Sequence, residues 1–267
     1  MSDFLKTMAT LSAERAALAQ AIDVSAAKPV VPLALGQFDV IAEIKDHSPA
    51  EGALAGADSD RCAQARRYAL GGAAAISVLT EPSRFAGSLE HLREVVNAVP
   101  ETPVMRKDFL VEPVQIEEAR LAGASGVLLI ASMLSDAKLG DMLECAFYHD
   151  MFVLLETFDS DDLARTSALL ERPMHQDRAH RGQFLVGVNT RNLRTLEVDA
   201  DRLARLAPLL PATKCVAESG LHTAEDVAYA AKLGYHLALV GSALMRSDDP
   251  AMLVAEMRAA GSARIAA

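Results

Sequence analysis

The segment from Pro103 to Ile130 reads PVMRKDFLVEPVQIEEARLAGASGVLLI and contains the unit that repeats along the chain. An apolar run, Pro103–Met105, is followed by an amphipathic stretch, Pro113–Leu121, and then by a second apolar run, Gly126–Ile130. Apolar runs without polar alternation are typical of strands that are covered on both faces, as in a parallel sheet. The segment therefore predicts a strand, a crossover helix and a second strand parallel to the first.

The same pattern recurs eight times, each apolar run being followed by a stretch with helical periodicity. Ser135, Ser160 and Thr223 are candidate N-caps of the helices that follow them. Eight strand-then-helix units predict an α/β fold, a closed (β/α)8 TIM barrel. An open doubly wound sheet is the alternative, although no G-x-G-x-x-G motif follows an early strand. The predicted strands are Val40–Ile44, Ala74–Leu79, Pro103–Met105, Gly126–Ile130, Met151–Leu155, Phe184–Val188, Lys214–Ala217 and His236–Val240.

Two segments do not follow the repeat, although we expect residues 1–267 to form a single domain. Residues 1–35 are predicted to be an N-terminal helical extension with one amphipathic helix at about Asp3–Ile22, and residues 36–267 the barrel. Pro29 and Pro32 separate the two parts. The polar residues 171–183 are predicted to be a loop insertion on the rim opposite the expected chemistry.

The composition and charge of the 267 residues narrow the class of protein. Hydrophobic residues make up 51% and charged residues 23%, as in ordinary globular proteins. Lys plus Arg number 26 and Asp plus Glu number 36, and the resulting net charge of −10 argues against a nucleic-acid partner. No run approaches the ~18 apolar residues of a membrane helix, and the N-terminus does not resemble a secretory signal. We therefore expect a cytoplasmic protein with no membrane partner, reduced cysteines and no metal site.

In a TIM barrel the functional residues lie at the carboxyl ends of the strands and in the loops that follow them. Glu43 and Lys45 are two residues apart at the end of the first strand, so both side chains are predicted to face the barrel interior. Buried charges are costly unless they are paired, and neighbouring charges shift each other's pKa values. We expect a ring of opposed charges that is suited to acid–base chemistry. Its other members are Lys107, Glu156 and Glu218, and Asn189 and Arg191 follow the sixth strand at the same rim.

Serine and glycine residues after the last two strands predict a phosphate site at the same rim. Glycine lets backbone N–H groups approach an anion, and the N-terminus of a short helix adds a favourable dipole. We expect Ser48 and Lys45 to close over this site from the first loop, and Phe85 and Phe109 to line a flat apolar pocket nearby. The predicted phosphate site consists of Ser219, Gly220, Gly241 and Ser242.

Taken together, these segments resemble the indole-3-glycerol phosphate synthases, which are TIM-barrel enzymes of tryptophan biosynthesis. The resemblance extends in order over essentially the whole predicted barrel, and the RKDF and VNTRNL segments are its most specific parts. Besides the opening segment, the matching stretches are VIAEIKDHSPAEG (Val40–Gly52), AAAISVLTEPSRFAGSLEHL (Ala73–Leu92), LLETFDSDDL (Leu154–Leu163), VGVNTRNLRTLEVD (Val186–Asp199) and AESGLHTAEDV with LVGSALM (within Ala217–Met245).

The resemblance implies that 1-(2-carboxyphenylamino)-1-deoxyribulose 5-phosphate is converted to indole-3-glycerol phosphate, carbon dioxide and water, without a metal or an organic cofactor. Lys107 would be the general acid of ring closure, with a pKa lowered by burial and cationic neighbours. Glu156 would be the partner acid/base of the dehydration, and Lys45 would assist proton transfer and anion binding. Glu43 would orient Lys45, and Glu218 would complete the charged ring.

The resemblance also implies which residues hold the substrate. Asn189 and Arg191 would bind its polar groups, and Phe85 and Phe109 would flank its anthranilate ring. Fixing both ends of a flexible sugar chain supplies much of the rate through positioning. The residues implied for the phosphate are Ser48, Ser219, Gly220, Gly241 and Ser242.

Two features depart from the pattern of the family. The first loop has Ala50 and Glu51 where a second serine and a basic residue are usual, and the N-terminal region is short. They leave open a paralogue that acts on a related arylamino sugar phosphate. A barrel like phosphoribosylanthranilate isomerase is a second alternative, but it would need a cysteine at the end of the first strand, and the sequence has none there. A binding or scaffold subunit is a third alternative, which the lysines and glutamates at the strand ends argue against. We expect a monomer or weak homo-oligomer whose partner is a small phosphorylated substrate.

Overall fold

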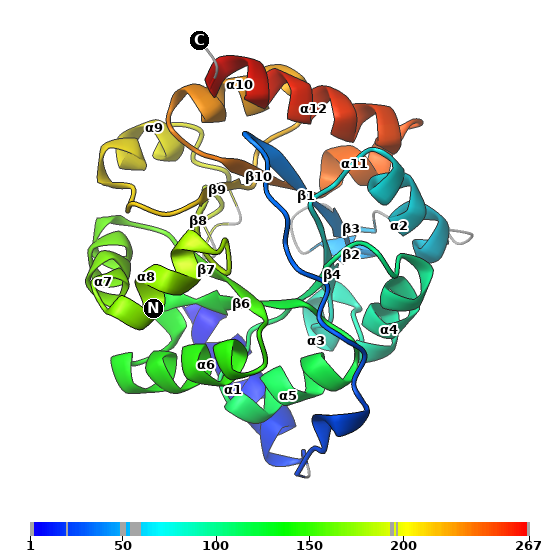
Figure 1. Ribbon diagram of the computed structural model, residues 1–267, viewed down its shortest axis with the longest axis vertical. Coiled ribbons are helices and arrows are strands. Elements are labelled where there is room, and N and C mark those ends of the chain that lie inside the picture. The colour runs from blue at the N-terminus through cyan, green and yellow to red at the C-terminus, as the bar shows by residue number, and fades with distance from the viewer. Residues whose placement is uncertain are drawn as a thin grey trace.

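The computed structural model describes residues 3–19, 21–48, 52–53, 60–192, 195 and 197–265. Eight parallel strands form one closed barrel, and Figure 1 shows them as an inner ring with helices around it. These strands are β1 (Asp39–Ile44), β4 (Ala75–Leu79), β5 (Val104–Lys107), β6 (Gly126–Ile130), β7 (Phe152–Thr157), β8 (Phe184–Asn189), β9 (Cys215–Glu218) and β10 (Leu237–Val240).

The strand order β1-β10-β9-β8-β7-β6-β5-β4 closes the ring, so the predicted TIM barrel is confirmed. Each of the eight predicted strands exists, with ends that differ from the prediction by two residues at most. The prediction did not include a small antiparallel pair after β1, formed by β2 (His47–Ser48) and β3 (Gly52–Ala53). All eight barrel strands run in the same direction, so their carboxyl ends meet at a single rim.

Helices follow the strands and cover the outside of the barrel, as Figure 1 shows. In the part of the chain that the structure describes, no helix is long and apolar enough to cross a membrane. The α-helices are α1 (Asp3–Ala17), α2 (Arg61–Leu70), α3 (Pro82–Phe85), α4 (Leu89–Ala98), α5 (Pro113–Leu121), α6 (Asp136–Tyr148), α7 (Ser160–Leu170), α8 (Pro173–His180), α9 (Arg202–Leu206), α10 (Ala224–Lys232), α11 (Ser242–Arg246) and α12 (Pro250–Ile265). The 3-10 helices are η1 (Val24–Ala26), η2 (Ala131–Met133) and η3 (Ala207–Leu209).

The loop insertion predicted at residues 171–183 is wrong, because most of it forms the helix α8. His175 and Ala179 are buried on one face of α8, so its polar sequence still contains a narrow core-facing stripe. The Nδ1 atom of His175 lies 2.8 Å from the carbonyl oxygen of Leu169, and its ring packs edge-on against Phe184. One buried histidine and one alanine give a weaker helical pattern than the leucines of other helices do.

Two predicted helix ends also need correction. The N-cap of α7 is Asp159 rather than Ser160, because the Asp159 carboxylate accepts the backbone N–H groups of residues 161 and 162. The N-terminal helix ends at Ala17, five residues before its predicted end. The other predicted N-caps are confirmed, since Ser135 and Thr223 each accept a backbone N–H of the first helical turn.

Two apolar layers make up the core, one between strands and helices and one inside the barrel. Along β1, Val40, Ala42 and Ile44 belong to the outer layer, whereas Ile41 belongs to the inner layer. Because side chains alternate along a strand, Glu43 continues the inward row of Ile41. Asp39 lies in the same row at the amino end, so the barrel interior is apolar in its middle and carries buried carboxylates at both rims.

Candidate active site

The carboxyl ends of the strands surround a cavity of about 960 Å³, a volume that includes its open mouth. Seven strands or the segments that follow them supply predicted site residues to its wall. Two predicted residues do not contribute to the described lining. Glu218 lies next to the lining carboxylates, and the side chain of Ser48 is outside the described part of the structure. The predicted residues that line the cavity are Glu43, Lys45, Phe85, Lys107, Phe109, Glu156, Asn189, Arg191, Ser219, Gly220, Gly241 and Ser242.

Glu43 is the centre of the charged cluster. Its Oε2 atom lies 2.5 Å from Nζ of Lys107, and its Oε1 atom lies 2.9 Å from Nζ of Lys45. Burial opposes ionisation of Glu43, but the two ammonium groups outweigh it and lower the pKa of this carboxyl to about 2. Glu43 is therefore a permanent anion near neutral pH, and it holds both lysines at the cavity wall.

The pKa of Lys107 is raised, which contradicts the lowered value expected from the sequence. Burial alone would lower this pKa, but the carboxylates of Glu43, Glu218 and Glu156 together have the larger, opposite effect. The expectation failed because it invoked burial and cationic neighbours and gave too little weight to the acidic side chains around Lys107. Lys107 is thus a cation held in an acidic cage, with its ammonium group at the cavity.

Glu156 and Glu218 form a second acidic group beside Lys107. Burial raises the pKa of Glu156, and burial together with the nearby Glu156 charge raises the pKa of Glu218 well above its ordinary value. Neither oxygen of Glu218 has a hydrogen-bond partner among the described residues when Glu218 is ionised. A Cβ atom at Gly187 would overlap Oε1 of Glu218, so only glycine leaves room for this carboxyl. The pair can therefore keep a proton near neutral pH.

The loops after β9 and β10 form a polar seat on another side of the cavity. Ser219 and Gly220 both have left-handed backbone conformations, with φ of 67° and 72°. The Thr190 hydroxyl donates to the Ser219 carbonyl at 3.0 Å and fixes this turn. At Gly241, a Cβ atom would overlap Oε1 of Glu43, so the loop after β10 approaches the charged cluster closely.

Aromatic side chains line the cavity on the side of β4 and β5. The ring centroids of Phe85 and Phe109 are 6.1 Å apart, and Phe4 of α1 meets Phe109 edge-on at 5.8 Å. Phe85 and Phe109 were predicted to line an apolar pocket, and both contribute to the cavity wall. The wall thus has an aromatic part, a charged part and a polar loop part.

Sequence reasoning missed Phe4, Asp108 and His222, which also line the cavity. Asp108 follows Lys107 directly, so its place at a strand end was an available signal. His222 lies two residues after Gly220, in the loop already predicted to bind an anion. Phe4 carries no such signal, because the packing of α1 over the rim is a tertiary feature.

One group of side chains in the described part of the chain could hold a metal ion. Glu117, Cys145 and His149 offer ligand atoms that all lie within 4.8 Å of one another. They belong to α5 and to the end of α6, and none of them is among the residues that line the cavity. The unusual loop residues Ala50 and Glu51 lie outside the described residues.

Comparison with known proteins gives one consistent family. The family model for indole-3-glycerol phosphate synthase matches residues 9–257. The chain is 41% identical to the indole-3-glycerol phosphate synthase of Paenarthrobacter aurescens, over 98% of this chain and 92% of that protein. It is 46% identical to the enzyme of the same name from a Nocardioides species, over 82% of this chain and 79% of that protein.

Solved structures with distant sequences share the fold. The 3-hexulose-6-phosphate synthase of Salmonella typhimurium superimposes with a TM-score of 0.63 at 15% identity, covering 85% of this chain and all of that chain. A monomeric form of the dimeric phosphoribosylanthranilate isomerase from Thermotoga maritima gives a TM-score of 0.55 at 15% identity, covering 83% of this chain and 99% of that chain. At these identities the likeness concerns the barrel alone.

Proposed function

The chain belongs to the indole-3-glycerol phosphate synthase family, and from this premise we propose how its cavity closes an indole ring. The substrate is 1-(2-carboxyphenylamino)-1-deoxyribulose 5-phosphate, and the products are indole-3-glycerol phosphate, carbon dioxide and water. The observation that carries the proposal is the Lys107 ammonium, 2.5 Å from Glu43 in the wall of a cavity that also has aromatic and polar loop parts. The cytoplasmic location and the monomeric or weakly associated state stay predictions.

The three parts of the wall match the three parts of the substrate. The phosphate binds at the loops with Ser219, Gly220, Gly241 and Ser242, where left-handed backbone and helix starts favour an anion. The anthranilate ring lies against Phe85 and Phe109. The ribulose chain then crosses the charged part of the wall, and its ketone comes near Lys107. Asn189 and Arg191 hold the polar groups between the two ends.

Ring closure requires a positive group at the ketone oxygen. The aromatic carbon that carries the carboxylate attacks the ketone carbon, so a C–C bond forms and the carbonyl π electrons move to oxygen. Lys107 is a cation because of its acidic neighbours, and it donates a hydrogen bond and then a proton to this oxygen. Glu43 stays ionised throughout and keeps the ammonium group in place.

Two bond-breaking steps follow. Carbon dioxide leaves from the ring carbon, and the electrons of the broken C–C bond restore the aromatic ring. The new hydroxyl group then leaves as water after it accepts a proton, while a base removes a proton from the intermediate. Glu156 serves in this dehydration, because its raised pKa lets it hold or accept a proton near neutral pH. Glu218 supports Glu156 from behind the cavity wall.

A direct assay tests the proposed function. The purified protein is mixed with the carboxyphenylamino substrate, without added metal or nucleotide, and the fluorescence of the indole product is followed. We expect steady product formation with one carbon dioxide released per indole formed. If this substrate is not converted but a related arylamino sugar phosphate is, the chain is a paralogue with a changed substrate.

A further inference from the structure

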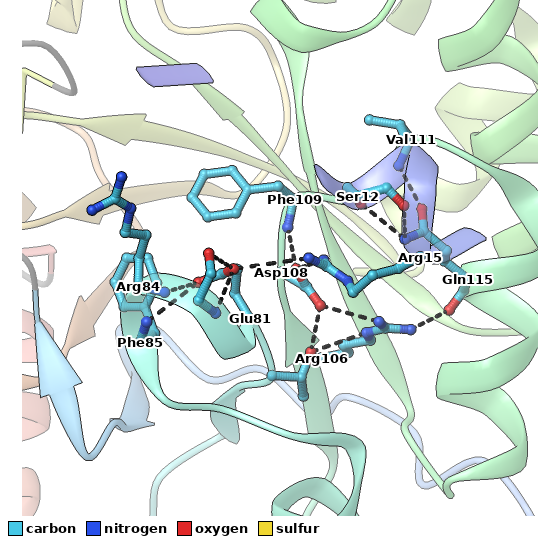
Figure 2. A network of polar contacts seen from close by, with 12 residues as sticks. Ser12, Arg15, Glu81, Arg84, Phe85, Arg106, Asp108, Phe109, Val111 and Gln115 are labelled. Carbon is cyan, nitrogen blue, oxygen red and sulfur yellow. Dashed lines mark hydrogen bonds and ion pairs between the residues drawn. The ribbon is translucent and has the colours of Figure 1, made fainter. Parts of the chain in front are cut away.

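The N-terminal helix α1 meets the catalytic rim through Arg15, which lies between two buried carboxylates (Figure 2). The Nη2 atom of Arg15 is 2.7 Å from Oδ1 of Asp108, and Nη1 is 3.8 Å from Oε1 of Glu81. The side chains of Asp108 and Glu81 are 0% and 1% exposed. A carboxylate withdrawn from water needs a positive or hydrogen-bonding partner, and here one cation on α1 serves two of them.

Each of these carboxylates also holds the backbone of a phenylalanine that lines the cavity. Oδ1 of Asp108 accepts the N–H of Phe109 at 2.8 Å. Oε2 of Glu81, the N-cap of α3, accepts the N–H of Arg84 at 2.7 Å and that of Phe85 at 3.3 Å. Figure 2 shows this chain of contacts from α1 to both rings. The positions of Phe85 and Phe109 are therefore linked to Arg15 through one intermediate each.

The two carboxylates depend on Arg15 to different degrees. Asp108 has a second cation, because Nη2 of Arg106 lies 3.0 Å from its Oδ2 atom, and the Thr80 hydroxyl donates to the same oxygen at 2.8 Å. Within the described residues, Arg15 is the only cation within 4.0 Å of Glu81. Oε1 of Glu81 also accepts the N–H and the hydroxyl of Ser83. Loss of Arg15 thus removes the counter-ion of Glu81 and a 2.7 Å hydrogen bond to Asp108, so the supports of both Phe85 and Phe109 are disturbed.

We propose that Arg15 is a positioning residue that holds Phe85 and Phe109 at the spacing required by the aromatic ring of the substrate. This inference rests on the proposed function, because it places the anthranilate ring against these phenylalanines. α1 also contributes Phe4, whose ring meets that of Phe109 edge-on. The ion pairs and hydrogen bonds described for Arg15 do not involve Glu43, Lys107 or Glu156, so its effect falls on substrate binding rather than on acid–base chemistry.

A second contact docks α1 independently of Arg15 and provides a matched control. Nε2 of Gln115 donates to the Ser12 hydroxyl at 2.8 Å, and Oε1 of Gln115 accepts the N–H of Val111 at 2.8 Å. The substitution Ser12→Ala removes a buried hydrogen bond between α1 and α5 but touches neither carboxylate. It therefore reports on looser docking of α1 alone.

Steady-state kinetics of Arg15→Ala, Arg15→Lys and Ser12→Ala test the proposal. We expect Arg15→Ala to raise KM about tenfold and to change kcat less than about twofold, which is the size expected for one lost charged hydrogen bond. Arg15→Lys keeps the charge and should bring KM back to within about threefold of the wild type. Ser12→Ala should leave KM within about twofold, and circular dichroism checks the fold of each variant.

A binding experiment separates the two ends of the substrate. The probes are the analogue of the substrate with its ketone reduced to an alcohol, which cannot cyclise, and inorganic phosphate. Arg15→Ala should weaken binding of the aromatic analogue about tenfold and leave phosphate binding unchanged. Equal weakening of both probes, an unchanged KM, or a fall in kcat without a change in KM would overturn the proposal. If Arg15→Ala does not fold, the same comparison is made with Arg15→Lys, which must show a smaller loss confined to the analogue.

The wild-type protein distinguishes failure of this inference from failure of the proposed function. If the wild type converts the carboxyphenylamino substrate and Arg15→Ala behaves identically, only the role of Arg15 is refuted. If the wild type does not convert it, the proposed function fails whatever the variants do.

Discussion

Strand β1 carries a buried carboxylate at each end, and the two are bound differently. At the amino end, Asp39 accepts from Arg258 at 3.0 Å and from the N–H of Gly36 at 2.6 Å, so each of its oxygens has a donor. At the carboxyl end, Glu43 binds Lys45 and Lys107, whose ammonium groups also line the cavity. Asp39 closes one end of the barrel, whereas Glu43 holds two cations where a ligand can reach them.

Glu218, at the carboxyl end of β9, differs from Asp39 even more than Glu43 does. It is as buried as Asp39, yet as a carboxylate it receives no hydrogen bond from the described residues, and its neighbour is another acid, Glu156. A buried carboxylate without a partner destabilises a fold unless it keeps a proton, and the pKa of Glu218 is raised accordingly. The difference suggests that complete pairing at the amino rim serves stability, while incomplete pairing at the carboxyl rim serves chemistry.

The largest effect is expected at Lys107. The substitution Lys107→Ala should lower kcat by at least about a thousandfold, because both the proton donor and the positive charge at the ketone are lost. The fold should persist, since Glu43 keeps Lys45 as a partner. The indole fluorescence assay measures the loss, and Lys138→Ala, a surface lysine paired with Glu112, is the control. Retention of more than a tenth of kcat would refute the assigned role.

A stability effect without an activity effect is expected at the amino rim. The substitution Asp39→Asn leaves Arg258 without its counter-ion and should lower the free energy of unfolding by about 2 kcal/mol. The loss is smaller than for a fully buried ion pair, because the Arg258 side chain is partly exposed to water. Urea denaturation measures this change. The kcat of the folded variant should stay within about twofold. A large loss of kcat with normal stability would contradict the assignment of the amino rim to stability and of the carboxyl rim to chemistry.

A smaller and opposite pattern is expected for Glu218→Gln. Unfolded Glu218 loses its proton near its ordinary pKa of 4.5, but the folded protein holds it to higher pH. The wild type therefore loses stability as pH rises from 4.5 through the raised pKa, and glutamine does not. The Tm of the variant minus that of the wild type should grow between about pH 5 and pH 8, and kcat/KM should fall by less than about tenfold. A Tm difference that is constant with pH would mean that Glu218 is not perturbed.

Much of the barrel could be predicted because apolar runs report strands that are buried on both faces. The strand-end rule likewise located Glu43, Lys107 and Glu156 at one cavity, since it needs only strand ends and direction. The helix α8 was missed because two buried residues of eight, His175 and Ala179, give little periodicity. Local sequence therefore predicts elements well where many residues share one environment.

What the sequence could not predict depends on distances between segments far apart in the chain. The sign of the Lys107 pKa shift depends on how close three carboxylates come, which no spacing along the chain reports. Phe4 reaches the cavity, and Arg15 reaches Asp108 in its wall, only because α1 packs over the carboxyl rim. Such contacts are decided by packing, and sequence pattern alone contains no signal for them.

The pH at which Lys107 loses its proton tests the central claim most directly. The 13C chemical shift of its Cε atom, assigned by comparison with Lys107→Ala, reports the charge of its ammonium group through a pH titration. We predict that Lys107 remains protonated beyond the ordinary lysine pKa of 10.5, and that Glu43→Gln moves its titration to lower pH. A Lys107 that titrates below 10.5, or that does not respond to Glu43→Gln, would contradict the acidic cage on which the proposed ring closure depends.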